Sequence, residues 1–131
     1  MAKEITYRGK TLDDLNNISL SDFMKIIPSR ARRSLRRGFT DPQKRLLLRI
    51  KKEKEGKTKK LIKTHCRDLV IIPDMLGVMI SVYNGKEFVP LQITQEMLGK
   101  YLGEFVSTRR KVQHSAPGIG ATKSSAAMSV K

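Results

Sequence analysis

Positive charge is concentrated in two parts of this chain, and that distribution limits where a folded core can form. Residues 29–68 carry sixteen Lys and Arg against four Asp and Glu, whereas residues 69–106 carry two against four. Like charges repel when they are packed together, so the near-neutral, apolar segment is the expected folding centre. The basic segments on either side of it, 29–68 and 107–131, are expected to bind a partner.

The overall composition indicates what kind of partner this is. The chain carries a formal charge of +15 on 131 residues, so a polyanion is expected. Aromatic residues make up 5% of the chain and Trp is absent, so the small core must be built from Leu, Ile, Val and Met. Cys66 is the only cysteine, and a zinc site of about four Cys or His ligands is therefore not expected, nor is any cofactor.

Arginines recur at spacings of three and four between Arg30 and Arg37, so on a helix several of them would share one face. Gly38 is expected to end this helix. Arg suits bidentate contact with phosphate, which makes nucleic acid the natural ligand. A merely solvated face is the alternative, but such faces usually alternate in sign.

A second basic helix is predicted from Asp41, as N-cap, to a stop at Gly56, with Pro42 at its first position. It has apolar and basic sides, so it can lie between a core and a phosphate backbone. A membrane surface is the alternative, but Trp and a clean apolar face are missing. The following stretch, Lys57–Lys63, is predicted to be a basic loop.

A shorter helix is expected before these two, capped by Ser19 or Ser21 and ended by Pro28. The first ten residues contain no apolar run, so a signal peptide is not expected. No stretch approaches the roughly 20 apolar residues of a membrane span, which favours a cytoplasmic protein.

The Asn84-Gly85 pair lies between two apolar runs, 78–83 and 88–93, and predicts a β-hairpin with a type I′ turn in which Tyr83 pairs with Lys86. This pairing puts one set of side chains on the core face: Val78, Ile80, Val82, Val89 and Leu91. The other face is mixed: Met79, Ser81, Tyr83, Lys86 and Phe88. Tyr83 and Phe88 are candidates for base stacking, with simple packing as the alternative.

Leu69–Ile72 is predicted to be a third strand, and Pro90 indicates that the second hairpin strand is an edge strand. Thr94 is expected to cap a short helix. The predicted fold is α+β: a small three-stranded sheet with a central β-hairpin, packed by short helices, with a basic N-terminal helical region and an extended C-terminal tail. Its parts are an N-terminal extension (1–28), a basic helical RNA-binding arm (29–63), an α+β core module (64–114) and a flexible basic tail (115–131).

Signals for catalysis are weak. His65 and Cys66 are adjacent, and neighbouring side chains on an extended chain point to opposite sides, so they make a poor catalytic dyad. Gly118-Ile119-Gly120 lacks the strand and helix that a dinucleotide-binding loop requires. No enzyme activity is expected.

Several motifs resemble the family of the universal small-subunit ribosomal protein nineteen. They are Arg33-Ser34-Leu35-Arg36-Arg37-Gly38, Ile72-Pro73-Asp74-Met75-Leu76-Gly77, Val82-Tyr83-Asn84-Gly85-Lys86, Thr94-Gln95-Glu96-Met97-Leu98-Gly99, Leu102-Gly103-Glu104-Phe105, Thr108-Arg109 and His114. The N-terminal 30 residues, which precede the first of these motifs, and the tail from His114 to Lys123 look like the archaeal and eukaryotic branch of the family.

The resemblance implies a structural protein of the small-subunit head that binds small-subunit ribosomal RNA beside ribosomal protein thirteen. It also implies a bridge to the large subunit, an approach to tRNA through the C-terminal tail, and a ribosome-bound location in the cytoplasm without a membrane. Charge and resemblance together predict these RNA contacts: Arg30, Arg32, Arg33, Arg36, Arg37, Lys44, Arg45, Lys52, His65, Arg67, Lys86, Arg109, Arg110, Lys111, His114 and Lys123.

Two other functions are compatible with parts of the sequence. A non-ribosomal DNA-binding protein would place the Arg30–Arg37 helix in a major groove and bind duplex DNA as tightly as ribosomal RNA. A small hydrolase would depend on Glu104 or Cys66 and keep its activity after removal of nucleic acid.

Overall fold

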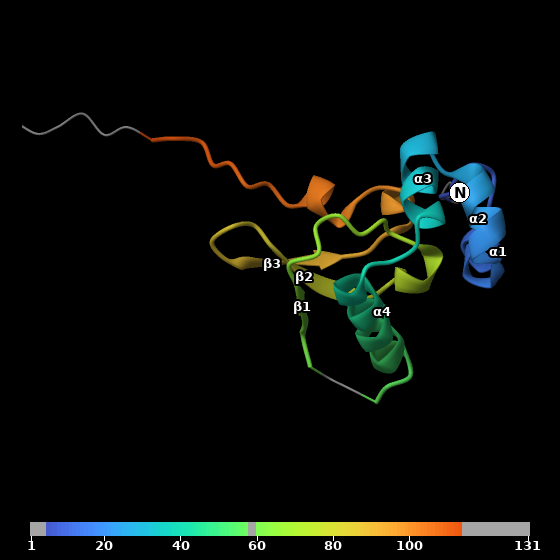
Figure 1. Cartoon of the computed structure of the whole chain (residues 1–131), viewed down its shortest axis with the longest axis horizontal. Coiled ribbons are helices and arrows are strands. Elements are labelled where there is room, and N and C mark those ends of the chain that lie inside the picture. The colour runs from blue at the N-terminus through green and yellow to red at the C-terminus, as the bar shows by residue number, and fades with distance from the viewer. Residues whose placement is uncertain (1–4, 58–59, 114–131) are drawn as a thin grey trace, which may run out of the picture.

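The computed structural model describes residues 5–57 and 60–113. Four helices come first, followed by a small sheet and three short 3₁₀ helices: α1 (Leu12–Asn17), α2 (Leu20–Ile26), α3 (Ser29–Arg36), α4 (Asp41–Lys54), β1 (Ile62–Thr64), η1 (Pro73–Met75), β2 (Met79–Tyr83), β3 (Phe88–Gln92), η2 (Gln95–Met97) and η3 (Leu102–Phe105). Figure 1 shows α1, α2 and α3 at one side of the molecule, the hairpin of β2 and β3 projecting at the other, and α4 beside the sheet. The predicted α+β class is confirmed.

The sheet has the strand order β1-β2-β3, with β1 parallel and β3 antiparallel to the central strand. Ile62 of β1 lies opposite Ile80 of β2, and Ile80 lies opposite Leu91 of β3. The parity of these pairs puts Ile80 and Val82 on the core face, where both are completely buried. This parity confirms the predicted division of the strand side chains between two faces. Ser81, on the face opposite Ile80, is nevertheless buried at 1% exposure, and Lys86, predicted to pair with Tyr83 on that face, lies between the two strands.

The hairpin turn is longer than predicted. Tyr83 pairs with Phe88 and not with Lys86, and the Asn84 N–H donates to the Glu87 carbonyl over 3.0 Å, which leaves a four-residue loop. A type I′ turn needs a positive φ at both central residues, but only Gly85 has one, at 100°. The Asn84 side-chain oxygen instead accepts from the N–H groups of Lys86 and Glu87. The register differs from the predicted one by two residues, which is why the faces are unchanged.

Pro90 lies in β3, at the edge of the sheet, as predicted. Antiparallel residue pairs alternate between exchanging and not exchanging hydrogen bonds. Bonds join Ile93 to Val78 and Asn84 to Glu87, so the intermediate pair of Ser81 and Pro90 is one that does not. The nitrogen of Pro90, which carries no hydrogen, therefore lies on the free edge, and the sheet loses no hydrogen bond.

The third strand is not the one predicted. Leu69–Ile72 is completely apolar and buried, but it lies outside the sheet and pairs with residues 99–102, where the Ile71 N–H donates to the Lys100 carbonyl. The strand is β1, at the end of the predicted loop. Its exposed Lys63 lies between the buried Ile62 and Thr64, and the surrounding lysines conceal this short alternation in the sequence.

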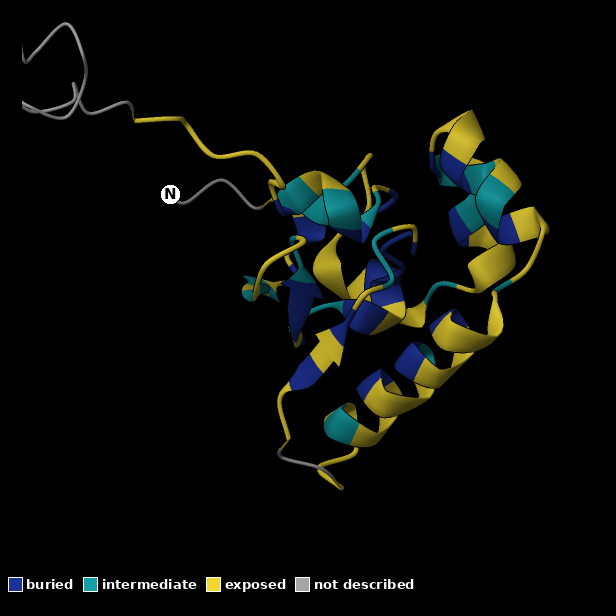
Figure 2. Ribbon diagram, turned by 60° about the vertical axis from the view of Figure 1, so that its left-hand side comes forward, coloured by how far each residue is buried: buried dark blue, intermediate teal, exposed yellow. Residues whose placement is uncertain are grey.

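A single hydrophobic core joins the helices to the sheet. Its members come from every part of the chain between Leu15 and Val106, including Phe23, Leu46 and Ile80. Figure 2 shows the buried residues of α4 along one side of that helix, with exposed residues on the other. No helix within the described residues is long and apolar enough to cross a membrane.

The helix ends follow local sequence signals. Ser19 caps α2, as predicted, and Thr11 caps α1, where hydrogen bonds from Thr11 lower the pKa of Asp14 below its usual value. Gly38, with φ at 84°, follows α3. The N-cap of α4 is Thr40 and not Asp41, because the Gln43 side-chain oxygen accepts from the Thr40 N–H over 3.1 Å. Gln43 also donates to Asp68 over 3.0 Å, which ties α4 to the segment after β1.

Replacing Ile80 by Ala is expected to lower the free energy of unfolding by about 2–5 kcal/mol, because the side chain is fully buried in the central strand. Met79→Ala on the same strand is the control, since Met79 is 45% exposed and its loss is expected to cost little. Urea unfolding of the two variants measures the difference. Equal destabilisation by both would contradict the assignment of the two faces.

Candidate nucleic-acid interface

Helix α3 presents arginines on the side opposite its buried residues. Ala31 and Leu35 are buried at 2% and 7% exposure, and at 100° per residue they share one side of the helix. Four arginines occupy the opposite side and are all exposed: Arg30, Arg33, Arg36 and Arg37. Among the described residues no carboxylate forms an ion pair with any of them. Four guanidinium groups are thus available to an anionic ligand.

Arg32, the remaining arginine of α3, points in another direction; Arg37 is the C-cap residue of this helix. Its Nε donates to the Met24 carbonyl over 2.8 Å, and one terminal nitrogen donates to the Ile27 carbonyl over 3.1 Å. Arg8 donates to the carbonyl of Ile26 in the same turn. Carbonyl groups at a helix C-terminus lack partners within the helix, so these two arginines cap α2. Arg32 therefore fixes the position of α3 against α2.

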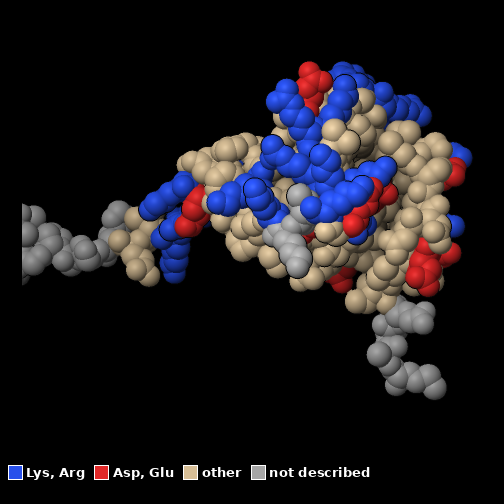
Figure 3. Space-filling view, turned by 90° about the horizontal axis from the view of Figure 1, so that it is seen from below, with Lys and Arg blue, Asp and Glu red and all other residues tan. Residues whose placement is uncertain are grey.

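Helix α4 extends the basic surface beyond Gly38. Leu46 and Ile50 are buried in the core, while Arg45, Arg49 and Lys52 lie along one exposed stripe at spacings of four and three. Lys44 is also exposed and forms an ion pair with Asp41 over 3.5 Å. Figure 3 shows Lys and Arg side chains gathered across the face seen from below Figure 1, with few Asp and Glu among them.

An open groove of about 340 Å³ lies between α4 and β1. It is lined by Arg49, Lys52, Lys60, Leu61, Ile62 and Lys63. Lys52 belongs to the predicted contact set, but Arg49, Lys60 and Lys63 do not. The helical spacing of Arg49 and Lys52 could have predicted that Arg49 belongs to this surface. Lys60 and Lys63 could not be placed there from the sequence, because they reach the groove only through the position of β1 beside α4. The groove has the positive charge that a phosphate backbone requires.

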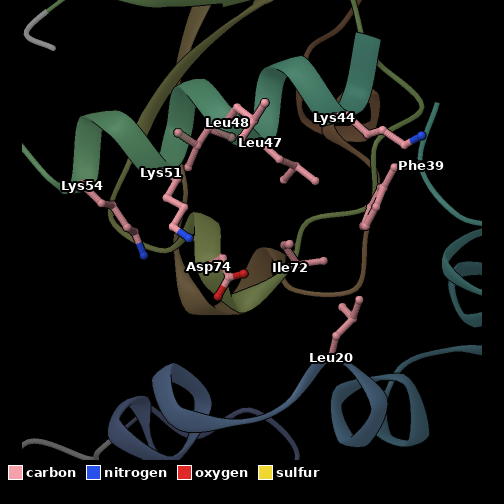
Figure 4. A pocket seen from close by; sticks show the side chains of 10 residues that line it. Leu20, Phe39, Lys44, Leu47, Leu48, Lys51, Lys54, Ile72 and Asp74 are labelled. Carbon is pink, nitrogen blue, oxygen red and sulfur yellow. The ribbon is translucent and has the colours of Figure 1, made fainter. Parts of the chain in front are cut away.

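A second groove, of about 630 Å³, differs in chemistry. Figure 4 shows it between α4, the segment around Ile72 and Asp74, and the start of α2, with Leu20, Phe39, Leu47 and Leu48 among its lining residues and Lys44, Lys51 and Lys54 at its edges. Its walls are apolar, so it resembles a protein contact more than a phosphate site.

Arg67, a predicted RNA contact, is bound to the backbone of three other segments. Its guanidinium donates to the carbonyls of Tyr83 and Gly103 over 2.8 Å each, and to that of Val106 over 2.6 Å. Gly103 is needed for this approach, because a Cβ at that position would lie 3.0 Å from both the Cβ and the carbonyl oxygen of Arg67. Arg67 thus holds the end of β2, η3 and the start of the C-terminal segment together.

The remaining predicted residues lie near the hairpin or outside the described chain. Arg109, Arg110 and Lys111 are exposed, and Arg110 forms an ion pair with Glu87 in the hairpin loop beside the exposed Lys86. His65 is exposed after β1 and contacts the rings of Tyr83 and Phe88. His114 and Lys123 fall outside the described residues. The predicted set therefore falls into an α3–α4 face and a hairpin group.

Comparison with known proteins agrees with the motifs that span this fold. The family model described as ribosomal protein S19 matches residues 33–114. The small ribosomal subunit protein uS19 of Saccharolobus solfataricus is 52% identical over 130 residues, which cover 98% of this chain and 93% of that protein. This chain belongs to the ribosomal protein S19 family.

As a member of the S19 family, the chain is a structural component of the small ribosomal subunit and not an enzyme. The resemblance noted in the sequence is confirmed. The archaeal relative aligns with nearly the whole chain, so its similarity also takes in most of the segment before α3, which the family model does not cover. Within the described residues no group of three or more His, Cys, Asp or Glu is arranged to hold a metal.

Arg67→Lys is expected to lower the free energy of unfolding by about 2–4 kcal/mol, because an ammonium group cannot replace the planar fork that reaches three carbonyls. The charge is retained, so the salt dependence of RNA binding should change little. Arg33→Lys is the matched control, and its stability should be unchanged. Chemical unfolding and RNA binding at several salt concentrations separate the two roles, and an unaffected stability in Arg67→Lys would refute the structural one.

Proposed function

We propose that this chain binds small-subunit ribosomal RNA in the head of the small subunit, chiefly through the exposed basic side of α3 and α4. The observation that carries the proposal is the division of α3, with Ala31 and Leu35 buried and four arginines exposed on the opposite side. The core fixes the orientation of the helix, so the guanidinium groups are presented without a further folding step. Membership of the S19 family supports ribosomal RNA as the polyanion that binds this surface.

Phosphate neutralisation is the expected source of affinity. Each Lys or Arg that contacts a phosphate releases counterions, so affinity falls steeply as salt concentration rises. The α4 stripe of Arg45, Arg49 and Lys52 and the groove beside β1 continue the charged surface, which favours contact with a folded RNA backbone over readout of single bases. These contacts depend on shape and charge, as expected for RNA helices.

Further partners follow from the family resemblance. We propose that the chain lies beside ribosomal protein thirteen, contributes to a bridge with the large subunit and approaches tRNA through residues 115–131. The apolar groove of Figure 4 offers a protein-binding surface for these contacts. Residues 107–131 contain five Lys and Arg and no Asp or Glu, a composition suited to binding RNA. A cytoplasmic, ribosome-bound location belongs to the same proposal.

Replacing Arg33, Arg36 and Arg37 together by Gln is expected to weaken binding to small-subunit ribosomal RNA and to reduce the slope of log K against log salt. Each lost phosphate contact lowers the slope by about 0.7–0.9, so the triple variant should lose about two to three units. Filter binding over a series of salt concentrations measures it. Lys25→Gln serves as the control, because Lys25 is exposed on α2 and already paired with Asp22 at 2.8 Å. An unchanged slope in a folded triple variant would reject this face as the contact surface.

Deleting residues 115–131 is expected to leave incorporation into the small subunit largely intact and to impair binding of tRNA to the assembled ribosome. The reason is that all of the predicted RNA contacts except Lys123 lie before this segment. Sedimentation of subunits and a tRNA-binding assay measure the two effects. A deletion variant that does not enter subunits would show that the segment is needed for assembly.

A further inference from the structure

Three aromatic rings meet on the outer face of the sheet. His65 follows β1, Tyr83 ends β2 and Phe88 begins β3. The centroid of His65 lies 4.6 Å from that of Tyr83 and 5.1 Å from that of Phe88, and the last two are 5.1 Å apart. Tyr83 and Phe88 lie opposite each other in the hairpin, and His65 joins them because β1 lies parallel to β2.

The strand registers place this cluster away from the core. Ile62 and Thr64 of β1 are buried, so the alternate residues Lys63 and His65 face outward. Tyr83 likewise alternates with the fully buried Val82. In the described part of the chain, Tyr83 and Phe88 belong neither to the hydrophobic core nor to the partly buried hydrophobic residues packed against it. His65 is exposed. Packing of the core therefore does not account for the cluster.

Positive charge lies beside the rings. The Lys63 ammonium group lies 5.5 Å from the centroid of the Phe88 ring. Lys86 is exposed in the adjoining loop, and in that loop the carboxylate of Glu87 is paired with Arg110. Aromatic faces with cations beside them match a nucleotide, which presents a flat base next to a phosphate. An apolar protein segment would gain nothing from these cations.

We propose that His65, Tyr83 and Phe88 form a stacking platform for one or more unpaired bases of RNA, with Lys63 and Lys86 beside the adjoining phosphates. This inference rests on the proposed function, since it takes ribosomal RNA as the ligand. Bases inside a duplex are stacked on one another and cannot reach a protein ring, so the platform selects a loop or bulged nucleotide. It would add local selectivity to the charge contacts of α3 and α4.

The test uses the full chain with His65→Gln and Phe88→Leu combined. Stacking on an aromatic ring is worth about 5- to 150-fold in affinity per base, and the double variant should bind small-subunit ribosomal RNA more weakly by that factor. The salt slope should stay unchanged, because no phosphate contact is removed. His65→Tyr with Phe88→Tyr is the matched control, which keeps two rings and should retain most of the affinity. Should the double variant fail to fold, His65→Gln alone tests the platform, since His65 is exposed and outside the core.

The outcomes separate this inference from the function on which it rests. Wild-type chain that does not bind the RNA with a steep salt dependence would overturn the proposed function itself. Wild-type binding combined with equal binding by the double variant would overturn the platform alone. Ultraviolet cross-linking in assembled subunits provides a second measurement: a nucleotide joined to Tyr83 or Phe88 supports the platform, and a protein segment joined there overturns it.

Discussion

The orientation of the whole basic surface depends on one constraint, which is that the charged helices and the sheet share a single hydrophobic core. Ala31 and Leu35 of α3 and Leu46 and Ile50 of α4 are buried in the same cluster as Ile80 of the central strand. Both basic helices contribute apolar residues of their own to this small core. Because one side of each helix is buried in the core, the opposite side faces solvent. The cations on that side repel one another at the surface, where solvent screens the repulsion.

Arginines in this chain have two distinct roles that charge alone does not separate. Arg33 and Arg36 face solvent. Arg32 and Arg67 instead donate hydrogen bonds to backbone carbonyls of other segments. Both roles use the same property, a rigid planar group with several donors. The internal arginines fix the positions of the helices that carry the external ones. If the proposed RNA interface is correct, a change at either kind is expected to weaken RNA binding, each for a different reason.

The sequence was informative wherever a local rule determines the outcome. Ser19, Gly38 and Gly56 mark helix boundaries through backbone chemistry, and alternation fixed the two faces of the hairpin even though the loop was two residues longer than predicted. The sequence was less informative where the structure of a segment depends on contacts with residues distant in the chain. Leu69–Ile72 has the composition of a strand but pairs with residues 99–102, while β1 is too short and too basic to stand out. The carbonyl partners of Arg67 and the meeting of His65 with Tyr83 and Phe88 likewise depend on the tertiary fold.

Pro90 also affects how the free edge of the sheet can pair with another molecule. The free edge of a small sheet invites a strand from another molecule, and many copies of a ribosomal component must stay apart until each is assembled. At Pro90 that edge offers no N–H, so an incoming strand cannot pair along its full length. Pro90 thus leaves the hairpin intact and makes edge-to-edge pairing of two copies less favourable at this position.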